Sequence, residues 1–374
     1  MSAEPETKGW CPGALRPMLS GDGWVVRVRP FGGRIQAAQA DGLAALAAAH
    51  GNGLIDISNR ANIQLRGVRE TSHAPLLEGL RALGLLDTDI DAESRRNILV
   101  QPFWRAGDDT ATIAADLTGL LKDDDLPELP GKFGYALDSG HTPTLQNAPA
   151  DVRLERDDMG NLIVIAEGSG TGKPVSNKTA AMEMISLARW FSDARGEYRR
   201  MASLLESGAS LPNGFDVPRQ TNLAGPAPGL SIEGALVGLT FGQMTSGTLA
   251  QLAKHGALRM TPWRMVLIEG AHQMPDIGGI ITRPDDPLLR VVACTGAPGC
   301  AQALGDTRVL ARRLAHLTQE MLHVSGCAKG CAHPRAAALT VTATTAGYNL
   351  IRNGTASDDP DMTDLTPDTL TKAI

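Results

Sequence analysis

Aromatic residues are scarce in this chain. They make up 4% of its 374 residues, whereas hydrophobic residues as a whole make up 43%. The cores must therefore be built mainly from Ala, Leu, Val and Ile, and a chain of this length is expected to divide into several domains. No apolar run approaches the roughly 18 residues that a membrane-spanning helix needs. The net charge of −6 is small for this length, which argues against a nucleic-acid or membrane-surface binder.

Signals for export and for nucleotide binding are also missing. The opening residues MSAEPETKGW are polar and lack the apolar stretch of a secretory signal, so a cytoplasmic protein is expected. Residues 161–174 (NLIVIAEGSGTGKP) place glycines after an apolar strand, but their spacing fits neither a P-loop nor a dinucleotide fingerprint. NADH is therefore not expected to dock on this chain, and a separate NADH-dependent reductase would have to supply electrons.

The sequence does contain a β–α–β order that occurs twice. In residues 23–30 (GWVVRVRP) apolar residues alternate with arginine, as in a strand, and residues 37–50 are rich in Ala and Leu, as in a helix. A further strand region follows at 53–66. The same kinds of element return, in the same order, at residues 229–242, 246–255 and 258–268. We predict an internal duplication, with two unrelated β–α–β pieces as the alternative.

A larger α/β region is predicted after each copy. In the first of these regions, strands are expected at residues 98–103, 131–136 and 162–166. In the second, a helix is expected over residues 307–322. Residues 213–229 contain several Pro and Gly and are predicted to link the two halves. The predicted domains are, in order, 1–75, 85–212, 220–275, 285–350 and an acidic, loosely held tail at 355–374.

Four of the five cysteines lie close together in the second α/β region. Cys294 and Cys300 form a C-x5-C pair, and Cys327 and Cys331 form a C-x3-C pair that follows after 26 intervening residues. Both pairs lie in glycine-rich turns, CTGAPGC and SGCAKGC, whose backbone N–H groups can point at sulfur. Because such donors stabilise the negative charge of a cluster held by four thiolates, the pattern predicts one [4Fe–4S] cluster on these cysteines.

Zinc binding and a purely structural role are the alternatives for these cysteines. Zinc sites favour C-x2–4-C pairs, so the second pair fits zinc whereas the first does not. A structural role would mean a disulfide or unrelated core cysteines, although a disulfide framework is not expected in a reducing compartment. Cys11 stands alone in GWCPGA and is predicted to be a small buried residue, with a ligand or redox role as its alternative.

The C-x5-C and C-x3-C pattern resembles that of the sirohaem-dependent nitrite and sulfite reductase family. In that family the four cysteines hold a [4Fe–4S] cluster, and one thiolate of the last pair also bridges to the sirohaem iron. Members repeat a ferredoxin-like segment and a larger α/β segment, which is the order predicted here. The resemblance therefore implies an α+β, pseudo-duplicated nitrite/sulfite reductase-like fold. It would have two ferredoxin-like half domains and two larger α/β domains, with the cluster in the second.

One segment resembles the arginine-bearing tetrapyrrole loop of that family. It is ISNRANIQLRG, residues 57–67, and the resemblance places Arg60, Asn62 and Gln64 at the ring. A planar guanidinium binds a carboxylate through two hydrogen bonds, so arginine suits the carboxylate rim of a tetrapyrrole. A surface charge is the alternative for any single arginine.

Two further segments resemble cation-bearing parts of the same site. RRNILVQPF, residues 95–103, would aim Arg96 at the ring. LPGKFGYAL, residues 129–137, matches the segment in which the reductases carry two lysines that grip a small oxyanion. Here Lys132 remains, but Gly134 stands at the second position, which puts nitrite or sulfite reduction in doubt.

The opening run GWCPGALRPMLSGDGWVVRVRP (residues 9–30) and the short length resemble one branch of the family more closely. In that branch a tetrapyrrole is the substrate, which implies an oxidoreductase of the monooxygenase type. The implied reaction is the O2-dependent oxidation of precorrin-3A to precorrin-3B in aerobic cobalamin biosynthesis, with meso hydroxylation and closure of a ring-A acetate lactone. A sirohaem nitrite or sulfite reductase is the first alternative, and an iron–sulfur electron carrier without tetrapyrrole chemistry is the second.

Oxygen activation would need an iron centre in addition to the cluster. His323 and His333 flank the second cysteine pair, and His141 follows the Lys132 segment. Each is a candidate ligand of a mononuclear non-haem iron. A lone histidine near a turn is more often a hydrogen-bonding scaffold, so the ligands of this iron stay unassigned.

Overall fold

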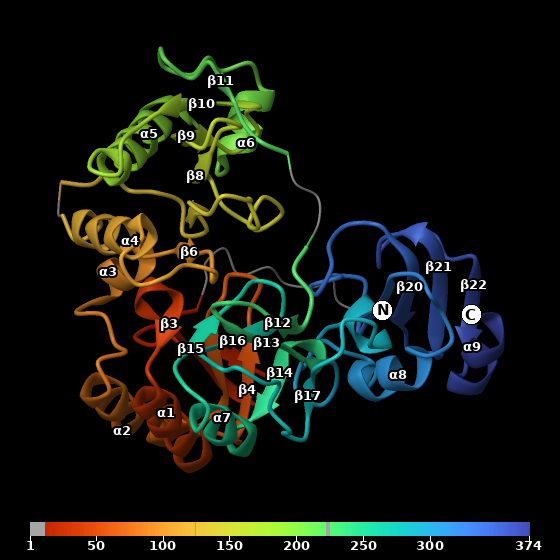
Figure 1. Cartoon of the computed structure of the whole chain (residues 1–374). Helices are drawn as coiled ribbons and strands as arrows, with labels where there is room; N and C mark the ends of the chain where they lie inside the picture. The colour runs from red at the N-terminus through yellow and green to blue at the C-terminus, as the bar shows by residue number, and fades with distance from the viewer. Residues whose placement is uncertain (1–11, 124, 222–224) are drawn as a thin grey trace.

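Two β–α–β segments form the centre of the computed structural model (Figure 1), which describes residues 12–123, 125–221 and 225–374. The elements of the first segment are β2 (Gly23–Val28), α1 (Ala37–His50), β4 (Leu54–Ile57) and β5 (Ile63–Val68). Those of the second are β13 (Gly234–Leu239), α7 (Ser246–Ala253), β15 (Leu258–Met260) and β16 (Met265–Glu269). The helix predicted at 37–50 is confirmed. The single strand predicted at 258–268 is a hairpin instead, because the chain reverses at Arg264, where φ is 61°.

Each segment contributes one short strand to the sheet of the other. β3 (Arg34–Ile35) pairs with β15, and β14 (Gln243–Thr245) pairs with β4. In both segments the exchanged strand follows a 3-10 turn, η1 (Phe31–Gly33) or η2 (Thr240–Gly242), and precedes the helix. One sheet runs β1 (Met18–Ser20), β2, β5, β4, β14, and the other runs β12 (Gly229–Leu230), β13, β16, β15, β3, with β17 (Ile280–Ile281) beside β13. The shared element order confirms the predicted duplication.

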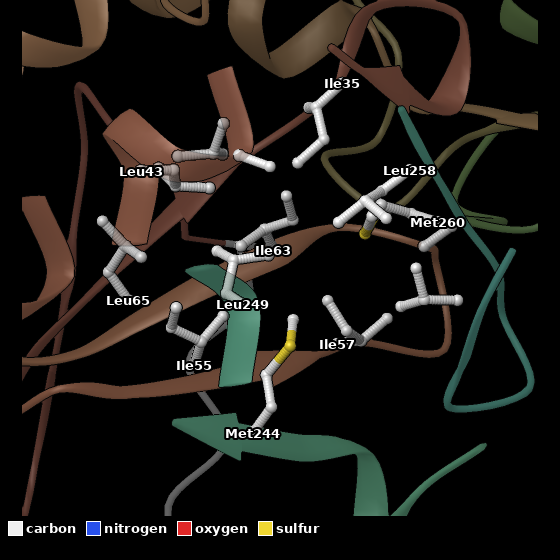
Figure 2. Close-up of a cluster of buried hydrophobic side chains, with 14 of the residues drawn as sticks. Ile35, Leu43, Ile55, Ile57, Ile63, Leu65, Met244, Leu249, Leu258 and Met260 are labelled. Carbon is white, nitrogen blue, oxygen red and sulfur yellow. The ribbon is translucent and has the colours of Figure 1, made fainter. Parts of the chain in front are cut away.

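One apolar core joins the two segments (Figure 2). Leu43 of α1 and Leu249 of α7 are fully buried in it, together with Ile63 of β5 and Leu258 of β15. The side chains labelled there are aliphatic or methionine, as the scarcity of aromatics predicted. Burying each such side chain contributes about 1.5–3 kcal/mol, so the shared core stabilises the two segments as one unit.

The two outer α/β domains repeat one topology. In the first, β6, β7 and β8 are parallel neighbours and β9 is antiparallel to β8; in the second, β18, β19 and β20 are parallel and β21 is antiparallel to β20. The strands of the first are β6 (Ile98–Val100), β7 (Tyr135–Leu137), β8 (Val152–Arg156), β9 (Leu162–Ala166), β10 (Thr171–Pro174) and β11 (Val217–Pro218). Those of the second are β18 (Val291–Ala293), β19 (Leu322–Ser325), β20 (Ala337–Ala343), β21 (Tyr348–Gly354) and β22 (Met362–Leu365).

Helices cover these sheets and connect them to the centre. Those of the first outer domain are α4 (Asp109–Leu120), α5 (Ala180–Ala194) and α6 (Met201–Glu206), and those of the second are α8 (Thr307–Leu314) and α9 (Pro367–Ala373). α2 (Glu70–Ala82) belongs to the first half domain and buries Leu76 and Leu80 in the shared core. α3 (Ile90–Arg95) lies between it and β6, and η3 (Pro287–Arg290) precedes β18. None of the helices in the described ranges is long and apolar enough to cross a membrane.

Two local predictions in the second outer domain were wrong. The helix expected over 307–322 ends at Leu314, because the chain must return as β19, a buried strand between β18 and β20. The tail at 355–374 is not loosely held. It forms β22, which pairs with β21, and α9, and it buries Leu365 and Leu370 in the core of the second outer domain. The predicted linker at 213–229 includes β11, which pairs with β10 of the first outer domain.

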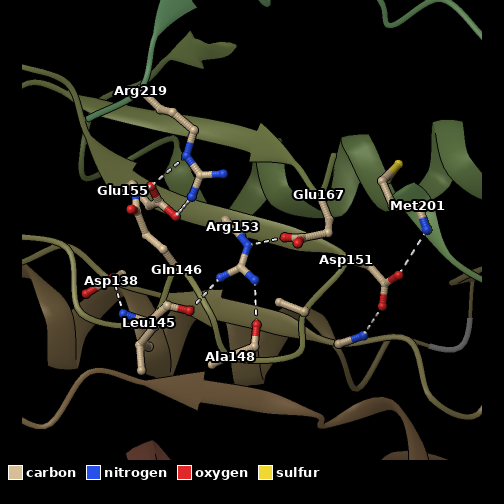
Figure 3. Close-up of polar contacts among 12 residues, drawn as sticks. Asp138, Leu145, Gln146, Ala148, Asp151, Arg153, Glu155, Glu167, Met201 and Arg219 are labelled. Carbon is tan, nitrogen blue, oxygen red and sulfur yellow. Dashed lines mark hydrogen bonds and ion pairs between the residues drawn. The ribbon is translucent and has the colours of Figure 1, made fainter. Parts of the chain in front are cut away.

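Buried charged residues support the loop that follows β7 (Figure 3). Arg153 on β8 is 1% exposed, donates to the backbone carbonyls of Leu145 and Ala148, and forms an ion pair with Glu167. Asp138 accepts a hydrogen bond of 2.6 Å from the backbone N–H of Leu145, and its burial raises its pKa to about 6. These groups together fix the loop.

Candidate functional site

The four cysteines of the second outer domain line one cavity. Cys294 follows β18 directly, and Cys327 lies two residues after β19. Because β18 and β19 are adjacent parallel strands, their carboxyl ends bring the two cysteine loops to the same edge of the sheet. Cys300 and Cys331 line the same cavity, whose volume is about 500 Å³.

Backbone geometry explains why these loops are rich in glycine. The N–H of Gly326 donates to the Sγ of Cys294 at 3.2 Å, as expected for a loop whose amides point at sulfur. A Cβ at Gly326 would lie 2.7 Å from the Cβ of Ala303, so only glycine allows the two loops to approach this closely. Thr307, the first residue of α8, donates through Oγ1 to the carbonyl of Cys294 at 2.8 Å. The first residue of α8 thus fixes the start of the first cysteine loop.

The donor set fits a cluster that takes one thiolate at each of four irons. The four described cysteines are free thiols, not disulfides. Burial raises the pKa of Cys331, and the thiols of Cys327, Cys294 and Cys300 raise it further, whereas Lys329 lowers it. Thiols gathered in this way need cationic compensation to ionise together, which iron would supply.

The turn between β1 and β2 covers the first cysteine loop. Ser20 donates through Oγ to the carbonyl of Gly299 at 2.9 Å. Arg66 of β5 donates to the same carbonyl through Nη2 at 2.9 Å and pairs with Asp22 at 2.7 Å. The guanidinium of Arg66 therefore connects the first half domain to the loop that carries Cys300.

A second connection runs through Asp56 of β4. This carboxylate accepts a hydrogen bond from Gln243 at 2.9 Å and pairs with Arg308 of α8 at 3.3 Å. Arg264 donates to the carbonyl of Ala332, next to Cys331, at 3.3 Å. Burial, with the nearby Arg308 as a second cause, lowers the pKa of Arg264 to about 10. Arginines thus lie beside both cysteine loops, where they would offset the negative charge of a thiolate cluster.

Two of the residues predicted to bind a tetrapyrrole come together at this cavity. Lys132 is one of its lining residues. Arg60, in the turn between β4 and β5, is half-buried and donates through Nη2 to the carbonyl of Lys132 at 2.8 Å. The Arg60 guanidinium of the first half domain is thus bound to the backbone of a residue of the first outer domain that lines the cysteine cavity, while Arg60 itself lines a narrow neighbouring gap.

The neighbours of Arg60 are less accessible. Gln64 accepts two hydrogen bonds from Arg27, at 2.7 and 3.2 Å, across the β2–β5 pair. Asn62 is buried and, with Ile98 and Leu99 of β6, lines a narrow gap beside the first outer domain. Their predicted contact with a ring stays a prediction.

Arg96 is engaged elsewhere. Its guanidinium forms two hydrogen bonds to Asp87, at 2.7 and 2.8 Å, donates to the carbonyl of Arg29 and stacks over Phe31. It is absent from the described lining of the cysteine cavity. In this geometry Arg96 joins the first half domain to the first outer domain, and a ring carboxylate would have to displace Asp87. The predicted contact of Arg96 with a ring stays a prediction.

The candidate iron ligands are not gathered into one site. His323 is fully buried, and neither of its ring nitrogens has a hydrogen-bond partner in the described structure. Its ring lies 5.8 Å from that of His333, and burial lowers its pKa to about 4. His141 lines a different cavity, in the first outer domain. Among the described residues, no three His, Cys, Asp or Glu side chains converge on a point that would suit a single metal ion. Cys11 lies outside the described residues.

The sequence interpretation missed the arginines beside the cysteine loops. A signal for one of them was available, because Arg66 follows Asn62 and Gln64 at the same two-residue spacing along the chain. No local pattern indicates Arg264 or Arg308, since their partners are distant in the sequence.

Comparison with known proteins identifies the family. Residues 16–83 match the nitrite/sulfite reductase ferredoxin-like half domain. A structure of the Mycobacterium tuberculosis NirA protein superimposes with a TM-score of 0.60 at 17% identity, covering 93% of this chain and 79% of that one, which shows the shared fold. A ferredoxin–nitrite reductase of Synechococcus elongatus is 26% identical over 86% of this chain and 76% of its own. A precorrin-3B synthase of a Sinorhizobium species is 30% identical over 94% of this chain and 84% of its own. The chain belongs to the precorrin-3B synthase family, on a nitrite/sulfite reductase-like fold.

Proposed function

We propose that the protein oxidises precorrin-3A to precorrin-3B in an O2-dependent reaction of cobalamin biosynthesis. The observation that carries the proposal is the single cavity that four cysteines share with Lys132, with Arg60 bound to the Lys132 backbone at its rim. A thiol set for an electron-transfer cluster and cations for carboxylates thus lie side by side. The relationship to a precorrin-3B synthase supports the same reaction.

Cys294, Cys300, Cys327 and Cys331 are the residues that would hold a [4Fe–4S] cluster, which supplies single electrons when bound. The backbone N–H of Gly326 stabilises the thiolate of Cys294, and the nearby arginines stabilise the negative charge of all four. All four proposed cluster ligands are residues of this chain. A separate NADH-dependent reductase is the proposed source of electrons.

Arg60 and Lys132 would orient the substrate. A guanidinium binds a carboxylate through a two-pronged contact that fixes its direction, and the lysine ammonium adds a second charge contact. Two such anchors on one rim limit which meso carbon faces the cluster side of the cavity. The chemistry requires two electrons and two protons from outside: one atom of O2 enters the product and the other leaves as water. A mononuclear iron is proposed as the site of oxygen activation, with ligands that are not assigned.

The test is turnover by purified protein. Anaerobically prepared protein with its iron and sulfide intact is mixed with precorrin-3A, NADH and a competent reductase, and O2 is then admitted. We expect a product heavier than precorrin-3A by one oxygen atom, labelled once by 18O2. Repeated absence of this product under conditions in which the protein's iron is reduced would overturn the proposal.

A sirohaem nitrite reductase is the second candidate, because the Synechococcus nitrite reductase is similar over 86% of this chain. Its test is nitrite consumption with reduced methyl viologen as the electron donor. We expect no turnover above that of a Cys331→Ser variant. Sustained ammonia production by the wild-type chain would favour this candidate over the first.

A further inference from the structure

Gly134 occupies a crowded position two residues after Lys132, which lines the cysteine cavity. It precedes β7 and is buried, and its N–H donates to Asp151 at 3.1 Å. A Cβ built on Gly134 would lie 2.9 Å from Nη1 of Arg60 and 3.2 Å from the carbonyl oxygen of Asn97. The first of these distances is too short for real side chains, so any residue other than glycine must displace the Arg60 guanidinium.

Backbone conformation does not explain this glycine. Gly134 is not among the glycines with positive φ, so an alanine could adopt the same backbone without strain. Gly131, three residues earlier in the same segment, also lacks a positive φ, and a Cβ there would meet no atom within 4 Å. The two positions differ in what surrounds them, and at Gly134 the neighbour is Arg60.

The Arg60 guanidinium is held at a defined place. Its backbone is fixed in the β4–β5 turn, where the Oγ of Ser58 accepts hydrogen bonds from the N–H groups of Arg60 and Asn62 at 3.3 and 3.1 Å. Its far end donates to the carbonyl of Lys132 at 2.8 Å. The space left by the missing side chain at Gly134 is what lets this far end reach Lys132.

We infer that Gly134 is a positioning residue for the tetrapyrrole: it leaves the space that keeps the Arg60 guanidinium against the Lys132 segment, at the rim of the cysteine cavity, where it binds a ring carboxylate. The inference rests on the proposed function, because a carboxylate-bearing tetrapyrrole is the ligand. It adds a specificity-determining position that acts through Arg60 and does not itself touch the ring.

The experiment is a double-mutant cycle with a matched control. Gly134→Ala, Arg60→Ala and the double variant are compared with wild type, and Gly131→Ala controls for an added methyl group in the same segment. The affinity probe is uroporphyrin III, a stable tetrapyrrole with carboxylate side chains, titrated by absorbance. Turnover of precorrin-3A supplies KM and kcat separately.

Gly134→Ala is expected to weaken uroporphyrin binding about tenfold, the loss expected for one charge-assisted hydrogen bond. KM should rise by a similar factor, with a smaller change in kcat, and Gly131→Ala should match wild type. In the Arg60→Ala background, Gly134→Ala should add no further loss, because the group that it displaces is already gone.

Two results would overturn the inference. One is unchanged binding in Gly134→Ala, and the other is an equal loss in both backgrounds, which would mean that the methyl group acts through Asn97 and not through Arg60. Misfolding does not hide the answer, since the double variant should fold as well as Arg60→Ala, and its failure to do so would also contradict the inference. If wild type binds uroporphyrin and follows this cycle but never oxidises precorrin-3A, the proposed function fails while the positioning role stands.

Discussion

The two outer domains share a strand order but differ at the ends of their first two parallel strands. Gln101 follows β6 in the first domain, at the place where Cys294 follows β18 in the second. The corresponding edge of the first domain has a cavity of about 450 Å³, lined by Gln101, Ser139, His141 and other polar residues, without a cysteine. The four described cysteines are therefore confined to two loops in one copy of a repeated scaffold.

The contacts that hold the two edges are also related. Arg259 of β15 donates to the carbonyl of Pro102 at 2.6 Å, and Arg66 of β5 donates to the carbonyl of Gly299 at 2.9 Å. In each case an arginine from a half domain fixes the loop after the first parallel strand. The repeated scaffold thus supplies loop placement, whereas the loop residues differ between the two copies.

The largest expected effect comes from removing a cysteine. Cys294→Ser should reduce bound iron and acid-labile sulfide from about four each to near zero and abolish turnover, because each iron needs its own thiolate. Gln101→Ala, at the corresponding place in the first domain, should keep both. Iron and sulfide analysis of the two variants measures this, and full iron in Cys294→Ser would remove Cys294 from the ligand set.

The next largest effect concerns the buried ion pair of the first domain. Arg153→Met leaves the loop carbonyls of Leu145 and Ala148 without their donor and should lower the free energy of unfolding by about 3 kcal/mol. Chemical denaturation measures the change. Arg283→Met, which breaks the fully exposed pair with Asp285, is the control and should leave stability nearly unchanged. Equal stability of the two variants would contradict the role given to Arg153.

Acid should act on the second domain through His323. Its pKa is about 4 in the folded chain against 6.5 in the unfolded one, so below pH 6.5 the unfolded state binds the extra proton. Stability should therefore fall as pH drops from 6.5 to 4, by about 3 kcal/mol in total. His323→Leu should flatten this dependence in denaturation curves. His255→Leu, at an exposed histidine, should leave the pH dependence of stability intact. If the two variants showed the same pH dependence, the prediction would be contradicted.

The smallest effect should come from the two loop-fixing arginines. Arg66→Met removes a cation near the cysteine cavity, which should lower the midpoint potential of the bound cluster by on the order of 50 mV. Arg259→Met removes the corresponding cation beside the first domain and should leave the potential unchanged. Redox titration followed by electron paramagnetic resonance measures the midpoint potential of the cluster in both variants. Equal potentials would show that the charge of Arg66 does not influence the cluster.

Local patterns in the sequence predicted the helix at 37–50, and the cysteine spacing placed four thiols that share one cavity. These succeed because helix periodicity and loop motifs are properties of neighbouring residues. The exchanged strands β3 and β14 have two and three residues, too few to show a period, and their partners belong to the other half. The sequence interpretation saw Gly134 only as a missing cation, whereas the structure has the Arg60 guanidinium in the space beside it.

The absorption spectrum of anaerobically purified protein, recorded with its iron and acid-labile sulfide content, decides whether the tetrapyrrole is a substrate or a resident cofactor. We predict a broad iron–sulfur shoulder and about four iron and four sulfide per chain. Any iron above four would belong to the proposed mononuclear site. We also predict no macrocycle bands, and their absence would make the tetrapyrrole a substrate. Sharp sirohaem bands that copurify with the cluster would contradict this account and make the ring a resident cofactor.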